Sequence, residues 1–227
     1  MERSCSQLPL PEADTPPGGI VWENTLLRSP TFRRAHVEVM LVANRVGVLH
    51  VCVFPNWDDP TPIFGFDMIA GPSRVSGIFL DLSPVLPGVL CPSLRDAVGS
   101  AALDSFAVRR ALPEWANIFS GDMLAVRPIN DDEIKHALTL AEWVLDGILS
   151  VLSATTGRLV EAIVAGQNRY CAAQRQNEHT VRMLGSFIGP AAARRFVDQV
   201  LFPIELPRDQ GAGLNSQGGP HRPENPD

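Results

Sequence analysis

The first half of the chain carries short apolar runs with the length and composition of β-strands. They are rich in Val, Ile, Leu and Phe, and residues that favour turns separate them. Asn44 and Gly47 tolerate positive φ, so they predict a hairpin between the first two runs. The predicted strands are residues 33–43, 47–54, 62–70, 75–82 and 121–127.

The second half of the chain has helical patterning. Asn130 with Glu133 forms a helix-start signal, and the helix should run to about residue 152. Its apolar residues fall roughly on one side: Ile134, Leu138, Trp143, Leu145 and Leu149. Other predicted helices are residues 93–110, 156–185 with a break near Asn177, and 189–201. Strands first and helices last, without alternation, predict an α+β fold with a largely antiparallel sheet and helices on its faces.

Ionisable residues interrupt the predicted strands. Glu38, His50 and Asp67 lie within apolar runs, and His36 precedes Glu38 by two positions. A buried ionisable group costs several kcal/mol unless it is paired. Strand side chains alternate between faces, so an even register would place Glu38 and His50 opposite or diagonal to each other, whereas an odd register would separate them.

These residues can be interpreted as structural or as functional. A single strand histidine is usually a hydrogen-bonded structural residue, and a Glu/His pair on an exposed face would simply be solvated. Two carboxyl groups and an imidazole on neighbouring strands, in apolar surroundings, instead favour a site that handles protons.

Composition narrows the class of protein. The chain has 227 residues, of which 45% are hydrophobic and 19% charged, as in an ordinary globular protein with a core large enough for a ligand pocket. A net charge of −6 argues against nucleic-acid binding. No apolar run reaches the roughly 18 residues of a membrane span, and the N-terminus lacks a signal core. We expect a cytoplasmic protein that binds no membrane.

Motifs for bound cofactors are missing from the sequence. The four cysteines are far apart without a Cys-x-x-Cys pair, so no metal site is expected. Glycine-rich nucleotide and flavin loops are also missing. Proline- and glycine-rich ends predict a flexible arm at 1–20 and a disordered tail at 204–227, around a single domain at 21–203.

Three pairs of arginines could form a basic patch. They are Arg33-Arg34, Arg109-Arg110 and Arg194-Arg195. Such pairs are typical of a solvated surface, and the functional alternative is a docking patch for an acidic partner.

A long set of motifs extends over roughly residues 22–203. It includes Glu23-Asn24, residues 29–33, His36-Val37-Glu38, Leu49-His50, residues 62–65 with Asp67, residues 69–72, residues 81–84, Trp115, Arg127-Pro128, Tyr170-Cys171, Asn177, Thr180, Arg182 and residues 199–202. This set resembles one known family, the ferredoxin-dependent bilin reductases, and within it most closely the phycocyanobilin:ferredoxin oxidoreductase branch.

This resemblance implies a fold and an activity. The fold would be a three-layer α/β/α sandwich, with biliverdin IXα between the sheet and the C-terminal helices. The enzyme would reduce biliverdin IXα by four electrons to phycocyanobilin through a substrate radical. Reduced [2Fe-2S] ferredoxin would supply the electrons, with no cofactor, metal or flavin bound in the protein. Heme oxygenase and a phytochrome or phycobiliprotein acceptor are further candidate partners of the expected monomer.

The resemblance also implies roles for the ionisable residues. Asp67 would protonate the bilin early and shuttle protons later, and His50 would donate near the lactam oxygens. Glu38 would serve reduction of the D-ring vinyl group, and His36 would help to supply protons.

Departures from the family pattern fall at residues 176–180. Glu178 stands where some members have an aspartate that serves A-ring reduction, and His179 replaces a lysine that could pair with a propionate. The candidate substrate contacts are Arg110, Gln174, Asn177, Glu178 and His179. The sister activity that gives phycoerythrobilin therefore stays open, as do a non-catalytic bilin-binding protein and a sheet-based interaction module.

Overall fold

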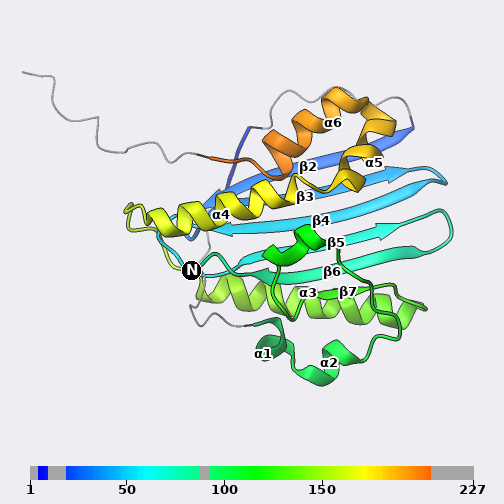
Figure 1. Cartoon of the computed structure of the whole chain (residues 1–227), viewed down its shortest axis with the longest axis horizontal. Coiled ribbons are helices and arrows are strands. Elements are labelled where there is room, and N and C mark those ends of the chain that lie inside the picture. The colour runs from blue at the N-terminus through cyan, green and yellow to red at the C-terminus, as the bar shows by residue number, and fades with distance from the viewer. Residues whose placement is uncertain (1–4, 10–18, 87–92, 206–227) are drawn as a thin grey trace, which may run out of the picture.

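A seven-stranded antiparallel sheet forms the centre of the protein, and its strands lie side by side in chain order (Figure 1). The structure, a computed structural model, describes residues 5–9, 19–86 and 93–205. The strands are β1 Ser6–Gln7, β2 Ile20–Ser29, β3 Phe32–Val42, β4 Val46–Pro55, β5 Ile63–Ala70, β6 Val75–Ser83 and β7 Leu124–Val126.

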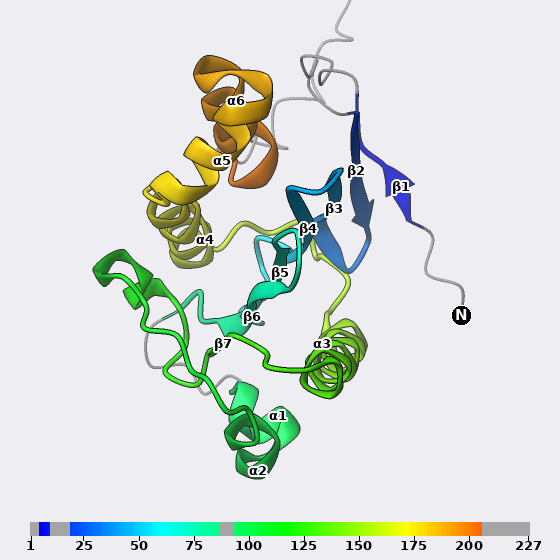
Figure 2. The same ribbon diagram turned by 90° about the vertical axis from the view of Figure 1, so that its right-hand side faces the viewer.

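Helices cover both faces of this sheet. Seen edge-on, α3 lies on one face and α4 to α6 lie on the other, which gives three layers (Figure 2). The α+β class and the α/β/α sandwich are therefore confirmed. The helices are α1 Leu94–Val98, α2 Ser100–Asp104, α3 Asp131–Val151, α4 Glu161–Gln174, α5 Glu178–Ile188 and α6 Pro190–Phe196, with the 3₁₀ turn η1 Glu114–Ile118 and the π-helical turn η2 Val197–Leu201.

Strands β3 to β6 confirm the four long predictions, and β7 is a shorter form of the fifth. Strand β2 was not predicted, because both of its faces mix polar and apolar residues and no alternation shows in the sequence. Within the predicted N-terminal arm, Ser6 and Gln7 pair with β2. The division into arm, domain and tail stays a prediction, and from residue 206 onward the tail lies outside the described residues.

The helix predictions hold at the start of α3 and at the break near Asn177, whereas the helix predicted from residue 156 begins at Glu161. Asn130 caps α3, where its Oδ1 accepts a hydrogen bond from the Glu133 backbone N–H at 2.8 Å. Asn177 caps α5 at the predicted break. The helix predicted at 93–110 is instead two short helices, because Gly99 has a φ of 80° and the chain is not helical after Asp104.

The predicted apolar side of α3 holds in part. Leu138, Leu145 and Leu149 are partly buried against the core, but Trp143 is 60% exposed. The buried residues of the helix lie next to this line and include two alanines, which a pattern of large apolar side chains does not mark. The buried residues are Ala137, Leu140, Ala141, Val144 and Ile148.

Two apolar layers hold the sandwich together. Phe64, Phe66 and Leu80 lie in the layer on the α3 side, together with residues of α1 and α2. The second layer, between the sheet and α4 to α6, includes Phe54 and Phe196. The side chains of the ionisable strand residues Glu38, His50 and Asp67 project from the sheet on this second side. Among the described residues, no helix is both long enough and apolar enough to cross a membrane.

Candidate active site

Glu38, His50 and Asp67 form one row across three neighbouring strands. Glu38 on β3 pairs directly with His50 on β4, and His50 pairs directly with Asp67 on β5. Directly paired residues project from the same face of a sheet. The even register is therefore the one that occurs, and it brings all three groups together.

His50 and Asp67 share a short hydrogen bond. His50 Nδ1 lies 2.7 Å from Asp67 Oδ1. Burial lowers the pKa of His50, but the charge of Asp67 and this hydrogen bond outweigh it, so the pKa lies above its usual value. His50 Nε2 is buried and has no hydrogen-bond partner among the described residues. A protonated His50 can therefore offer its Nε2–H to an acceptor in the site.

Glu38 is a buried carboxyl group with one fixed donor. It is 3% exposed, and Trp22 Nε1 donates to its Oε1 at 2.6 Å. Burial raises the pKa of Glu38 above its usual value, although the charge of His50 and the Trp22 hydrogen bond act against that shift. Glu38 therefore keeps its proton to higher pH than an exposed glutamate and can act as an acid.

His36 is fully buried behind this row. Its Nε2 lies 3.0 Å from Asn24 Oδ1, which accepts and so places a proton on Nε2. Burial, with the positive charges of His50 and Arg34, lowers the pKa of His36 to about 2. The His36 ring is therefore neutral, and its centroid lies 5.4 Å from that of His50.

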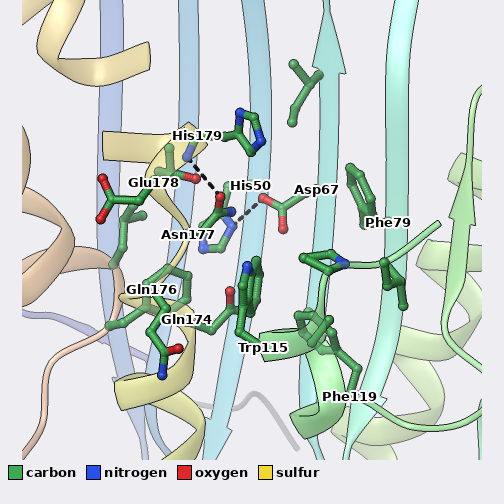
Figure 3. A pocket seen from close by; sticks show the side chains of 18 of the residues that line it. His50, Asp67, Phe79, Trp115, Phe119, Gln174, Gln176, Asn177, Glu178 and His179 are labelled. Carbon is green, nitrogen blue, oxygen red and sulfur yellow. Dashed lines mark hydrogen bonds and ion pairs between the residues drawn. The ribbon is translucent and has the colours of Figure 1, made fainter. Parts of the chain in front are cut away.

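A cavity of about 860 Å³ opens against this row (Figure 3). Ligand pockets typically measure about 300–1,000 Å³. Its walls include Glu38, His50 and Asp67 from the sheet and Trp115 and Phe119 from the η1 region, while α4, α5 and the turn between them close the other side. Within the described residues, no three or more His, Cys, Asp or Glu side chains are grouped to hold a metal ion.

All five predicted substrate-binding residues line the cavity: Arg110, Gln174, Asn177, Glu178 and His179. Some of them already have partners. Arg110 donates to the Ser76 carbonyl at 2.8 Å, and Gln174 donates to the Tyr170 hydroxyl at 2.9 Å.

Glu178 lines the cavity, but its carboxylate is engaged outside the row of Glu38, His50 and Asp67. It pairs with Arg194 at 3.1 Å. Figure 3 shows its carboxylate directed away from His50 and Asp67. The carboxylate of this glutamate therefore contacts α6 in this structure.

Two residues of the site were not predicted. Asp81 lines the cavity, and its buried carboxylate accepts from the Ser83 hydroxyl at 2.5 Å and from the Ser120 backbone N–H at 3.1 Å. Its position near a strand end suggested only turn chemistry. Trp22 carried no signal in the sequence, because its strand was not recognised.

The basic-patch hypothesis was wrong for Arg33 and Arg34, which are both buried. Arg33 Nη1 lies 2.8 Å from Glu205 Oε2, and its guanidinium lies 3.8 Å from the centre of the Trp57 ring. Arg34 donates to the Val200 carbonyl at 2.5 Å. These arginines tie β3 to the C-terminal helices and present no surface for docking.

A profile of the family described as ferredoxin-dependent bilin reductase matches residues 11–203. The chain belongs to this family. Two relatives named phycocyanobilin:ferredoxin oxidoreductase come from Prochlorococcus marinus. The protein of strain MIT 9313 is 32% identical over 79% of this chain and 69% of its own, and that of strain SARG is 31% identical over 81% and 76%. This bilin reductase is thus an oxidoreductase of a ferredoxin-dependent family.

Solved structures share the fold of this bilin reductase. Phytochromobilin synthase from tomato, solved in complex with biliverdin, superposes with a TM-score of 0.70 over 88% of this chain and 77% of its own, at 15% identity. A structure of PcyX superposes with a TM-score of 0.53 over 82% and 81%, at 22% identity. The three-layer sandwich is therefore shared across distant sequences.

Proposed function

We propose that this bilin reductase converts biliverdin IXα to phycocyanobilin, with four electrons from reduced ferredoxin and four protons passed through the protein. One observation carries the proposal: Glu38, His50 and Asp67 stand in a row against a cavity large enough for a tetrapyrrole. Each of the two vinyl reductions consumes two electrons and two protons, so a site that renews its protons is required.

The conjugated bilin itself accepts the electrons. [2Fe-2S] ferredoxin delivers them one at a time, so the bilin passes through radical states. Each electron adds negative charge inside a cavity that is poor in water, and an unpaired charge there is costly. Prompt protonation by a neighbouring acid removes this cost and makes the electron transfer favourable.

Asp67 is suited to receive a proton from His50 and to pass it to the bilin. Its side chain is 39% exposed and borders the cavity, whereas that of His50 is almost fully buried. Protonated His50 can return a proton to Asp67 across their 2.7 Å hydrogen bond. The free Nε2–H of His50 can meanwhile bind a lactam oxygen of the bilin. His36, held by Asn24, keeps the His50 side of the row ordered and supports its proton supply.

Glu38 serves as the second acid, for the D-ring vinyl group. It lies on the far side of His50 from Asp67 in the same row. Its raised pKa, caused by burial, keeps a proton on it until the bilin draws that proton away. Two acids on either side of one imidazole can therefore serve different parts of one substrate.

The cavity rim is suited to the two propionates and the lactams. Arg110 is exposed and lines the cavity, and arginine binds carboxylates through two parallel hydrogen bonds. His179 lies in the first turn of α5, where the helix dipole favours anions. Gln174 and Asn177, which also line the cavity, add amide groups for the lactams.

An anaerobic assay with biliverdin and reduced ferredoxin tests this function, with the product identified by chromatography. We expect phycocyanobilin from the wild type, and a product with an intact D-ring vinyl group from Glu38→Gln. Phycoerythrobilin as the wild-type product would overturn the proposed regiochemistry but not the family. If biliverdin binds but stays unreduced, the catalytic proposal is wrong and the protein is a bilin carrier. If biliverdin does not bind, the alternative that the protein is a sheet-based interaction module is supported.

A further inference from the structure

Trp22 reaches Glu38 from the neighbouring strand. Trp22 on β2 pairs with Met40 on β3, two residues along from Glu38, so the two side chains lie diagonally on one face of the sheet. The indole Nε1 lies 2.6 Å from Glu38 Oε1. The indole ring also packs against Phe196, with 4.6 Å between ring centres. Contacts on two sides therefore fix the direction of its N–H.

The chemistry of the indole distinguishes the two oxygens of Glu38. An indole N–H can only donate. In a neutral carboxyl group the carbonyl oxygen is the better acceptor, so Oε1 is held as the carbonyl and the proton resides on Oε2. Glu38 borders the cavity, whereas Trp22 is not part of its lining. The indole thus holds the carboxyl group from behind and leaves Oε2 free for the substrate side.

We propose that Trp22 is a positioning residue for proton delivery by Glu38, an inference that rests on the acid role of Glu38 proposed above. In the step, the Oε2–H bond breaks and a C–H bond forms on the D-ring vinyl group of the reduced bilin. The electron pair of the broken bond stays on the carboxyl group, which becomes a carboxylate.

The Trp22 hydrogen bond strengthens during this step. A charged acceptor makes a hydrogen bond roughly twice as strong as a neutral one. The gain develops as the proton leaves, so it lowers the barrier and does not merely improve binding. It also opposes the effect of burial, which by itself makes Glu38 a weak acid. Trp22 therefore keeps a deeply buried carboxyl group able to release its proton.

Two substitutions at position 22 separate this role from packing. Trp22→Phe keeps an aromatic ring but removes the donor. An isosteric residue, 3-benzothienyl-alanine, keeps the shape of the indole and replaces its N–H by sulfur. Trp143→Phe is the matched control, since Trp143 is 60% exposed on α3. A hydrogen bond to a charged group contributes about 1.5–3 kcal/mol, and about half of that is the gain over a neutral acceptor. We therefore expect the Glu38-dependent reduction to slow by about 4- to 12-fold in both position-22 variants, with biliverdin affinity kept within about twofold.

Infrared spectroscopy of the substrate-free enzyme gives a readout that does not depend on turnover. The C=O stretch of protonated Glu38 is assigned by its loss in Glu38→Gln. We expect it to move to higher frequency in both position-22 variants, because the carbonyl loses its donor, and to stay in place in Trp143→Phe. If Trp22→Phe fails to fold, the isosteric variant decides the question.

Failure of this inference and failure of the proposed function look different. If Glu38→Gln makes phycocyanobilin at the wild-type rate, the acid role of Glu38 is wrong. If Glu38→Gln blocks D-ring reduction while the benzothienyl variant keeps both the wild-type rate and the wild-type C=O band, only the positioning role of Trp22 is overturned.

Discussion

His50 and Asp67 are joined by a 2.7 Å hydrogen bond, yet His50 is buried and the Asp67 side chain is 39% exposed. The pair thus links the buried row to the open part of the cavity. A proton held by the imidazole can pass across this bond to Asp67, which borders the open part of the cavity. This relationship carries most of the predictions below.

Replacing Asp67 should separate binding from turnover. Asp67→Asn keeps the size of the side chain but removes the acid, and loss of a positioned acid typically costs about 10²- to 10⁴-fold in rate. We expect biliverdin titrations to give near wild-type affinity while product formation falls by at least about 100-fold. Asp146→Asn, on the exposed side of α3, is the control. Equal rates in both variants would contradict the role of Asp67.

The pH dependence of turnover should follow His50. Its pKa is raised by Asp67 against the effect of burial, so the protonated form persists above the usual value and is lost as pH rises through the raised pKa. Activity should therefore fall on the alkaline limb of the pH profile, where His50 loses its proton. In Asp67→Asn the opposing burial effect dominates, so the limb should move to lower pH. Profiles of kcat/KM for the two proteins check this, and a limb that stays in place would argue that another group titrates.

His36 should make the fold sensitive to acid. Its pKa of about 2 lies far below the usual value near 6.5, so the unfolded chain binds a proton there that the folded chain does not. The stability contributed by neutral His36 is present above about pH 6.5 and is lost as pH falls. Between about pH 7 and pH 5 the wild type should lose about 2 kcal/mol more unfolding free energy than His36→Gln. Urea unfolding at both pH values measures the difference, and parallel curves would contradict it.

Arg33 should matter for stability and not for ferredoxin. Burial lowers the pKa of Arg33 to about 10, against the effect of Glu205, so the buried charge depends on its partners. Removing one partner of a buried ion pair costs about 3–5 kcal/mol. Glu205 is partly exposed, so Glu205→Gln should cost toward the low end of that range, with the KM for ferredoxin unchanged. Arg109→Gln, at an exposed arginine, is the control for stability. If Glu205→Gln raised the KM for ferredoxin and left the stability unchanged, the hypothesis that Arg33 and Arg34 dock ferredoxin would be restored.

The sequence predicted the centre of the fold well and its edges poorly. Strands β3 to β6 show as apolar runs because they are buried on both faces of the sandwich. Strand β2 covers the row at its edge, where Trp22 and Asn24 make polar contacts, so its pattern is mixed. Strand β2, which holds two of the site's hydrogen-bond partners, was therefore a strand that patterning could not reveal.

The candidate site was predictable as a set of residues but not as an arrangement. Charged residues in apolar runs indicated Glu38, His50 and Asp67, yet their register depends on the hydrogen bonding between strands. Burial of Arg33 depends on Glu205, more than 170 residues away along the chain, and no local pattern encodes that contact. Contacts between residues that are distant in the sequence therefore decided both the strand register of the site and the burial of Arg33.

The most direct test of the account follows the bilin radical after a single electron. The biliverdin complex is mixed anaerobically with one equivalent of reduced ferredoxin and frozen at intervals for electron paramagnetic resonance. We expect an organic radical in both the wild type and Asp67→Asn, decaying at least about 100-fold more slowly in the variant because its proton supply is cut. Equal decay in the two proteins, or no radical on the bilin in either, would contradict a cavity whose acids protonate the pigment as electrons enter it.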